Sequence, residues 1–470
     1  MENISLDEII AATGGTLLKG SAALYLPDLC TDTRAIKKGN TFLALKGPNF
    51  NANELLAEAV KKGAAGLICE KKPAPAVLRK VRFAIMVKNG LVALQQIASV
   101  YRDKFDIPVV AVTGSNGKTT TKEMIGKILS RRLCTLVTPG NLNNQIGLPL
   151  TILQLHKGHQ AAVLELGTSA LGEIEVLARI AKPTVGVVTC IGHSHLQDLK
   201  NLSTVLRAKM ELIDNLGSAG IAVMNNDDPW LRKKLKSITS QVITFGVIHK
   251  SNVTAYKIAS QPAKNKILFI MGQGAQSRKV SLNILGKHNV YNALAAAGTS
   301  LALGIPLADI AKGLSSFHAV SGRMKMVKKR GLTILDDSYN ANPDSMKAAL
   351  HVLESFSCGR RKIAVLGDML ELGQESGKKH REIGEIIGQL GVDMLYTIGP
   401  QSQLLAQAAL QSGIPLEKIN RFSTGQEQLL LSSLKATMRR RDVLLFKASH
   451  GMHLEKIVAG ILNSKGSMKQ

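Results

Sequence analysis

The chain has 470 residues, of which 45% are hydrophobic and 20% charged, a composition typical of a folded globular protein. So long a chain exceeds what one hydrophobic core usually organises, and about three domains are expected. The net charge of +26 favours anionic ligands such as nucleotides. The basic residues are dispersed, however, and aromatic residues make up only 4%, so base-stacking platforms and a nucleic-acid partner are not expected.

The cysteine pattern and the lack of long apolar runs predict a cytoplasmic protein. Five cysteines occur in odd number and without CxxC spacing, which argues against a disulfide framework or a zinc site: Cys30, Cys69, Cys134, Cys190 and Cys358. The first residues, MENISLDEII, have no basic stretch ahead of an apolar one, and no segment reaches the roughly 18 apolar residues that span a bilayer. We therefore expect no membrane span.

Residues 1–104 are predicted to form a small N-terminal α/β domain. Short strands and helices alternate with turns here, including a strand at residues 41–45 and a helix at about residues 54–62. The character of the sequence changes after residue 104, where longer buried strands begin.

Residues 105–318 are predicted to form a central domain around a parallel sheet. β-branched apolar runs lie at residues 107–114, 161–167 and 184–192, with helical segments between them. This alternation is typical of a doubly wound α/β sheet, which binds ligands beyond the C-terminal ends of its strands.

The first of these strands leads into a glycine-containing turn and a helix, in the segment TGSNGKTTT. Backbone N–H groups at such a turn would cradle phosphates, Lys118 would neutralise the β- and γ-phosphate oxygens, and Thr119 would bind Mg²⁺. The general Walker pattern has glycine where this chain has Val112, so the match is to the shorter form GxxGK[ST]. The predicted nucleotide-binding residues of this P-loop are Gly114, Ser115, Asn116, Gly117, Lys118, Thr119 and Thr120.

The P-loop alone is compatible with several functions. A GTPase would carry a base-reading NKxD segment, which the sequence lacks. A nucleic-acid-binding ATPase remains open on charge, and so does a ligase that activates a carboxylate with ATP.

Polar residues follow the next two predicted strands of the central domain. Glu165 ends one strand, and His193 and His195 come just after another. Because the C-terminal ends of parallel strands meet at one edge of a sheet, Thr119, Glu165 and His195 are expected to converge there. Oxygen ligands with one imidazole suit Mg²⁺ or Mn²⁺ better than zinc, so a magnesium site is predicted.

Lys209 occupies an unusual position in the helical segment 201–216. At about 100° per residue, it falls at the centre of an apolar stripe formed by Leu202, Val205, Leu206, Leu212, Ile213 and Leu216. A buried ammonium is costly unless it is paired or chemically changed. Snorkelling or an ion pair is one explanation, and a modified lysine is the other.

A second alternation of strands and helices predicts a Rossmann-like domain at residues 319–470. Strands are expected at residues 333–337, 362–369, 394–399 and 442–449, with helices at residues 345–356 and 381–390. Ahead of this domain, GKHNVYNALAAAGTSLALGI is predicted to be a loop that feeds a helix. The fold class is therefore α/β with three domains: the small N-terminal domain, the central P-loop ATPase-like parallel sheet and the C-terminal Rossmann-like domain.

Together these segments resemble those of the Mur ligases, a family of ATP-dependent amino-acid and peptide ligases. The resemblance covers nearly the whole chain and rests on TGSNGKTTTKEM, LELGTSALGEIEVLARIAKP, IGHSHL, RAKMELI, GKHNVYNALAA, SGRMKMV and LDDSYNANPDSMKAAL. Within the family, LDDSYNANPDSM and LGDMLELGQES are most similar to the member that adds D-alanyl-D-alanine to UDP-N-acetylmuramoyl-tripeptide. The DNPR motif of the sibling that adds a diamino acid is absent.

This resemblance implies a ligase of peptidoglycan precursor synthesis that uses ATP and Mg²⁺. ATP would phosphorylate the terminal carboxylate of the tripeptide, the amine of the dipeptide would attack the acyl phosphate, and phosphate would leave. A Mur-type ligase with another amine or acceptor, or a basic P-loop nucleic-acid-binding ATPase, remains the alternative. The chain is expected to act as a monomer.

The resemblance also implies roles for single residues. Lys209 matches the lysine that reacts with CO₂ to form a carbamate, and with Lys118 and His195 it makes up the expected catalytic set. The expected metal ligands are Thr119, Glu165, His195 and the modified Lys209. Positions that match ATP contacts are Asn292, Arg323 and Asp337; those near the nucleotide and the incoming amine are Tyr339 and Asn340; and those for the uridine, in TDTRAIKKGNTFLALKG, are Thr33 and Arg34.

Two segments depart from the family pattern. FNANEL offers Asn51 and Asn53 where the family usually carries an aspartate and a histidine. The KGSR-like motif near the C-terminus is replaced by KASH at residues 447–450. Both segments are expected to contact the UDP-linked substrate or the peptide end rather than ATP.

Overall fold

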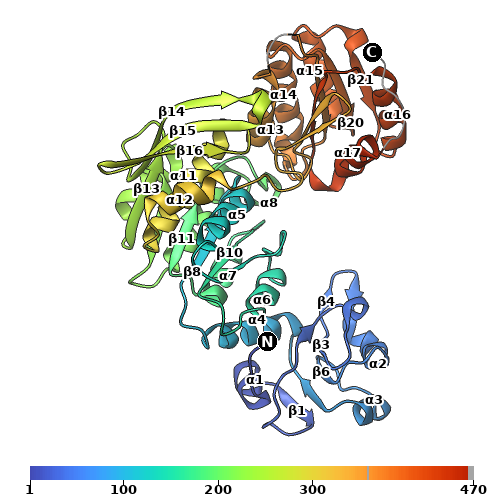
Figure 1. The fold of residues 1–470 in the computed structure, drawn as a ribbon. Helices are drawn as coiled ribbons and strands as arrows, with labels where there is room; N and C mark the ends of the chain where they lie inside the picture. Colours follow the sequence, from blue (N-terminus) through green and yellow to red (C-terminus); the bar gives the residue numbers. More distant parts are fainter. Residues whose placement is uncertain (357–358, 464–470) are drawn as a thin grey trace.

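The computed structural model describes residues 1–356 and 359–463, and Cys358 lies outside them. Three α/β units follow one another along the chain and lie in a row, with the central unit between the other two (Figure 1). This confirms the predicted α/β fold class, while the boundaries after residues 104 and 318 stay predictions. The four cysteines in the described part are free thiols. No helix in that part is long and apolar enough to cross a bilayer.

The first unit is built on a five-stranded sheet in the order β1-β7-β6-β3-β2, in which only β1 runs antiparallel to its neighbour. Its strands, with the small β4–β5 ribbon, are β1 Thr16–Lys19, β2 Leu29–Cys30, β3 Thr41–Leu43, β4 Lys46–Gly47, β5 Phe50–Asn51, β6 Gly66–Cys69 and β7 Phe83–Met86. Its helices are α1 Leu6–Thr13, η1 Thr33–Ala35, η2 Ala52–Leu55, α2 Leu56–Lys61, α3 Pro75–Lys80 and α4 Gly90–Arg102. Helix α4 packs against α1 and, in the central unit, against α6 and α7, so it joins the two units.

The central unit has a nine-stranded sheet in the order β16-β15-β14-β13-β12-β11-β8-β10-β9. The strands are β8 Val109–Thr113, β9 Thr135–Val137, β10 Ala161–Glu165, β11 Val185–Val188, β12 Ile221–Asn225, β13 Gln241–Gly246, β14 Val253–Gln261, β15 Lys266–Gln273 and β16 Gln276–Leu282. The helices are α5 Lys118–Leu129, α6 Gly147–Ile152, α7 Glu173–Ala181, α8 Leu196–Leu199, α9 Leu202–Asp214, α10 Pro229–Lys234, η3 Leu235–Ser237, η4 Pro262–Lys264, α11 Lys287–Ala302 and α12 Leu307–Ser315. Strands β8 to β14 are parallel, as predicted, but β15 and β16 add an antiparallel edge that was not predicted.

The third unit has a six-stranded sheet in the order β17-β18-β22-β19-β20-β21, parallel except for β17. Its strands are β17 Lys325–Lys329, β18 Leu332–Asp336, β19 Lys362–Gly367, β20 Met394–Ile398, β21 Ile419–Phe422 and β22 Val443–Lys447. Its helices are α13 Pro343–Glu354, η5 Gly373–Glu375, α14 Ser376–Gln389, α15 Ser402–Gln411, η6 Leu416–Lys418, α16 Glu427–Thr437, η7 His450–Met452 and α17 Leu454–Leu462.

The strand order places a switch point in each of the two larger sheets. Strand β8 has β10 and β9 on one side and β11 to β14 on the other, and the last strand, β22, lies between β18 and β19. In open α/β sheets ligands bind beyond the strand C-termini at such points. Apolar residues of all three units belong to one continuous buried cluster.

Candidate active site

The phosphate loop follows β8, whose β-branched residues are buried in the central sheet. Gly114 and Gly117 both have positive φ, of +142° and +83°. A Cβ atom at Gly114 would lie 1.9 Å from Thr189 Oγ1, and one at Gly117 would lie 2.2 Å from Asn292 Oδ1. Only glycine fits either position. The turn leads into α5 at Lys118, whose first N–H groups have no partner within the helix.

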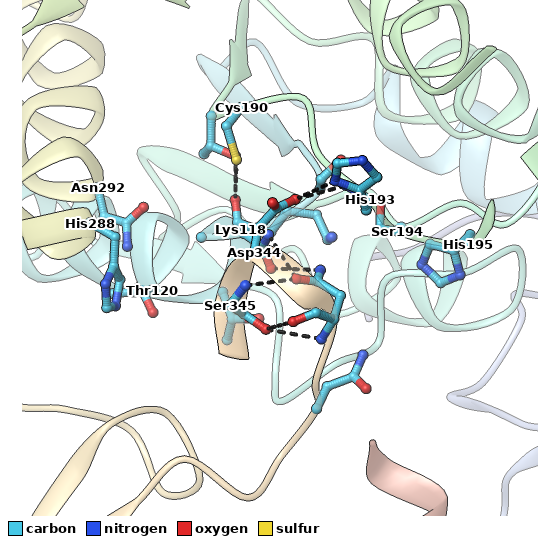
Figure 2. A pocket seen from close by; sticks show the side chains of 18 of the residues that line it. Lys118, Thr120, Cys190, His193, Ser194, His195, His288, Asn292, Asp344 and Ser345 are labelled. Carbon is cyan, nitrogen blue, oxygen red and sulfur yellow. Dashed lines mark hydrogen bonds and ion pairs between the residues drawn. The ribbon is translucent and has the colours of Figure 1, made fainter. Parts of the chain in front are cut away.

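A cavity of about 760 Å³ is lined by residues of both the central and the third unit. Its walls include the segments that follow β8, β10, β11 and β12 in one sheet and β18, β19 and β22 in the other. The predicted site residues that line it are Ser115, Asn116, Gly117, Lys118, Thr119, Thr120, Glu165, His195, Asn292, Arg323, Asp337, Tyr339 and Asn340. Figure 2 shows His288 and Asn292 on one side of Lys118 and His195 on the other.

Two cationic side chains, Lys118 and Arg323, lie at the phosphate loop. Lys118 Nζ donates to Gly114 O at 2.7 Å. Burial lowers the pKa of the Lys118 ammonium, and the nearby Glu165 carboxylate opposes that shift. Arg323 Nη2 lies 3.4 Å from Thr119 Oγ1, and its guanidinium stacks 3.9 Å above the Tyr339 ring. This end of the cavity can therefore neutralise a polyphosphate.

The residues predicted to bind a metal lie along the same wall. Glu165 is 1% exposed; its Oε1 accepts from Asn143 Nδ2 at 2.8 Å, and its Oε2 has no hydrogen-bond partner among the described residues. His195 Nδ1 lies 2.7 Å from Glu371 Oε2, and this contact lowers the pKa of the Glu371 carboxyl despite its partial burial. Nowhere in the described ranges do three His, Cys, Asp or Glu side chains group as a metal site by themselves. A cation here would need further oxygen ligands.

The start of α11 forms the other end of the cavity. Asn292 is buried, and its Nδ2 donates to Asn289 Oδ1 at 2.9 Å. His288, which sequence reasoning did not single out, also lines the cavity. Burial lowers its pKa to about 4, so its imidazole is neutral at physiological pH. Its place directly before Asn289 in GKHNVYN was the available signal.

The segment after β18 is held from β22. Lys447 Nζ lies 2.6 Å from Asp337 Oδ2 and donates to Asn340 O at 2.9 Å. The Tyr339 ring stacks on His450 with a centroid distance of 5.1 Å. Lys447 and His450, the ends of the departing KASH segment, therefore support cavity-lining residues.

Lys209 does not line the cavity but is buried in α9, 1% exposed, at the centre of the helix's apolar face. Its burial, and then the positive charge of Lys118, place the pKa of Lys209 well below its ordinary value. No other described residue forms a hydrogen bond or an ion pair with its ammonium. The structure therefore does not show the ion pair that was one explanation for a lysine on this apolar face.

Direct contacts join the phosphate loop and the loop after β11 to the start of α13. Asn116 and Asn342 exchange side-chain amide hydrogen bonds, at 3.2 Å and 2.9 Å. His193 N donates to Asp344 Oδ2 at 2.8 Å, and His193 Nδ1 lies 3.2 Å from the same oxygen. Sequence reasoning missed these pairs, because Asn116 and Asn342 are 226 positions apart.

Thr33 and Arg34, the predicted uridine contacts, lie in η1 of the first unit and do not line the cavity. Arg34 forms an exposed ion pair with Asp32 at 2.7 Å. The asparagines of FNANEL are engaged locally: Asn51 Oδ1 caps η2, and Asn53 Oδ1 accepts from the backbone of Glu70.

Comparisons with known proteins identify relatives along nearly the whole chain. A model of the Mur ligase middle domain matches residues 112–300, and a model of the Mur ligase glutamate ligase domain matches residues 322–450. UDP-N-acetylmuramoyl-tripeptide–D-alanyl-D-alanine ligase of Bacillus subtilis (strain 168) is 37% identical over 438 residues, which cover 93% of each chain.

Solved structures give the same result. A crystal structure of MurF from Acinetobacter baumannii has a TM-score of 0.88 and 34% identity, covering 99% of this chain and 100% of that one. A crystal structure of MurF from Thermotoga maritima in complex with ADP has a TM-score of 0.80 and 28% identity, covering 92% of this chain and 96% of that one.

Proposed function

The chain belongs to the Mur ligase family, and from this membership we propose how its cavity carries out the reaction. The protein is an ATP-dependent ligase that joins D-alanyl-D-alanine to UDP-N-acetylmuramoyl-tripeptide in peptidoglycan precursor synthesis. The observation that carries the mechanism is the single cavity in which a phosphate loop faces the strand ends of a second parallel sheet. Two substrates and a nucleotide can meet there.

We place the ATP phosphates against the backbone of Ser115 to Thr120. The first turn of α5 offers N–H groups there, and Lys118 and Arg323 supply positive charge. The base would then lie toward Asn292, on the opposite side of Lys118 from His195. Asp337 directly follows β18 and lines the cavity, as does Arg323. We expect Asp337 to contact ATP.

The unpartnered oxygen of Glu165 supports the predicted magnesium site. A buried carboxylate oxygen without a donor is costly, and a cation beside it would remove that cost. Thr119, Glu165 and His195 would hold Mg²⁺ together with phosphate oxygens, because these side chains alone are too few for its octahedral shell. When bound, the ion supplies charge neutralisation to the phosphates.

We further propose that Lys209 is carbamylated. Burial favours the neutral amine that CO₂ requires. The ammonium would first give up one proton. The neutral amine nitrogen would then bond to the CO₂ carbon and release a second proton, so that an anion replaces the buried cation near Lys118. That anion would help to position the magnesium at Glu165 and His195.

In the reaction, the terminal carboxylate of the tripeptide attacks the γ-phosphorus of ATP, and ADP leaves. Lys118 and Arg323 neutralise the charge that spreads over the transferring phosphoryl group. The dipeptide amine, having lost its extra proton, then attacks the acyl carbon, an amide bond forms, and phosphate leaves. Tyr339 and Asn340 line the wall where this second substrate would arrive.

The remaining expectations also belong to this proposal. Thr33 and Arg34 would bind the uridine end of the substrate in the first unit. The chain is proposed to act as a monomer. Nucleotide-linked substrates and ATP both support a cytoplasmic location.

Trapping of the acyl phosphate tests the mechanism. With ATP, UDP-N-acetylmuramoyl-tripeptide and hydroxylamine in place of the dipeptide, a hydroxamate and ADP are expected. The lysine-containing and diaminopimelate-containing tripeptides should be compared as acceptors. AMP as product without a hydroxamate would contradict an acyl phosphate, and ATP hydrolysis stimulated by DNA or RNA would favour the nucleic-acid-binding ATPase instead.

A further inference from the structure

Seven carboxylate side chains line the cavity in the described part of the chain: Glu165, Glu173, Asp227, Asp228, Asp337, Asp344 and Glu371. Five of them contact two or more donors of the protein itself, and these are Glu173, Asp227, Asp228, Asp337 and Asp344. Glu165 has one free oxygen, which is explained by the proposed metal. Among the described residues, the side chain of Glu371, which is 54% exposed, has a polar contact only with the ring of His195. Glu173 and Asp344 also keep one oxygen without a donor among the described residues, but their other oxygen has two or more contacts. Outside the proposed metal site, Glu371 is therefore the carboxylate that the protein itself restrains least.

The backbone of Glu371 is held in a conformation that glutamate disfavours. Its φ is +62°, in the left-handed region. The carbonyl of Glu371 accepts from Gln197 N at 2.9 Å, and the neighbouring Leu370 N donates to Ser449 Oγ at 2.8 Å. The turn is thus fixed by the central unit on one side and by the segment after β22 on the other. Strain that the surroundings enforce in this way is concentrated at functional sites.

The incoming dipeptide needs such a carboxylate. It arrives with an ammonium group, whereas the cavity already holds the cationic side chains of Lys118, Arg323 and Lys447. A further cation would be repelled unless an anion received it. Glu371 lies beside His195, on the side of Lys118 away from α11, where the acyl phosphate would form.

We propose that Glu371 binds the ammonium group of D-alanyl-D-alanine and directs its nitrogen toward the acyl carbon. The inference rests on the proposed function and adds to it the residue that recognises the second substrate. One carboxylate oxygen keeps the contact with His195, and the other accepts the charge-assisted hydrogen bond from the ammonium.

The test compares a charged with an uncharged nucleophile. Glu371→Gln keeps the size and the polar contact with His195 but removes the negative charge. We expect kcat/KM for D-alanyl-D-alanine to fall about 10- to 100-fold, the effect of losing a hydrogen bond to a charged group. Trapping with hydroxylamine, an uncharged amine at mildly alkaline pH, should continue at the wild-type rate.

Two further variants separate binding from structure. Glu375→Gln alters a carboxylate of the adjacent η5 that does not line the cavity, so both reactions should stay at wild-type rates. Glu371→Gly relaxes the left-handed backbone, so it should unfold at the same or a higher temperature than wild type while losing dipeptide use as Glu371→Gln does. If Glu371→Gly instead unfolds at a lower temperature and loses both ligation and hydroxamate formation, Glu371 is a structural contact.

The inference is overturned if Glu371→Gln uses the dipeptide as wild type does, or if hydroxamate formation falls as much as ligation. Either result would contradict the role of Glu371 and leave the proposed function standing. The proposed function is tested separately, by hydroxamate formation with the wild-type protein in the same assay.

Discussion

Lys209 has a pKa far below its ordinary value of 10.5, because its ammonium is buried and lies near the charge of Lys118. A base of this kind binds fewer protons in the folded state than in the unfolded state. The free energy of unfolding therefore rises with pH between the lowered pKa and the ordinary one. At neutral pH the folded protein bears a cost for Lys209 that carbamylation would remove.

Lys209→Met should therefore be more stable and less active than wild type. In bicarbonate-free buffer at neutral pH we expect the free energy of unfolding to increase, because the substitution removes a buried amine that burial disfavours in its charged form. The rise of stability with pH should also become weaker. Urea unfolding at several pH values measures both effects, and a variant less stable than wild type at neutral pH would contradict them.

The role of Lys209 in catalysis is tested with Lys209→Ala, which we expect to be nearly inactive in ligation. Short carboxylates at millimolar-range concentration should partly restore its activity by replacing the carbamate. Wild-type turnover in Lys209→Ala would exclude a catalytic carbamate.

Residues whose role depends on local pattern were predictable. The P-loop is a contiguous motif, and the burial of Lys209 follows from the spacing of apolar residues within one helix. Glu371 could not be found in this way, because its importance comes from a contact with His195 and from a positive φ that no local signal announces.

At the scale of elements, the N-cap residue of helix α13 forms two kinds of contact. Asn342 is the N-cap, and its Oδ1 accepts from Ser345 N at 2.9 Å. The same side chain exchanges amide hydrogen bonds with Asn116 of the phosphate loop. The start of this helix is thereby joined directly to the phosphate loop of the neighbouring unit.

Two substitutions separate the cap from the amide pair. Asn342→Asp keeps a good N-cap acceptor but loses the donor to Asn116, so stability should be unchanged while the ligation rate falls about tenfold. Asn342→Ala loses both and should also cost about 1 kcal/mol of stability. Urea unfolding and ligation rates measure the two effects, and a wild-type rate in Asn342→Asp would show that the amide pair is not used.

Elements with strong hydrophobic patterns were predictable as well. The buried parallel strands β8, β10, β11, β19 and β22 lie within the predicted runs, and β18 begins one residue before its predicted run. Strands β14 to β16 were missed because they are only half buried, and β14 is irregular between Tyr256 and Ala259, which interrupts its alternation.

At the scale of the whole molecule, the first unit stands apart from the cavity. Figure 1 shows it at the opposite end of the row from the third unit. Its predicted uridine contacts, Thr33 and Arg34, do not line the cavity, and the side chain of Arg34 is 86% exposed. The sequence could not predict which units move toward each other when substrate binds, because that movement depends on how the units are arranged in space.

A substrate held at its uridine end by the first unit and at its carboxylate end in the cavity should draw the units together. We expect the radius of gyration in small-angle scattering to fall when UDP-N-acetylmuramoyl-tripeptide is added, and to change less with an ATP analogue alone. Arg34→Ala should weaken the response to the UDP-linked substrate only. An unchanged radius at saturating substrate would mean that the units already stand at their working separation.

The amide pair between Asn116 and Asn342 carries no net charge. Added salt screens interactions between exposed charges but has little effect on a neutral hydrogen bond. Substrate arrival is different, because a chain of net charge +26 attracts polyphosphates over a distance that shrinks as ionic strength rises. Ionic strength should therefore govern how fast nucleotides reach the phosphate loop and leave unaltered the contact that joins the loop to α13.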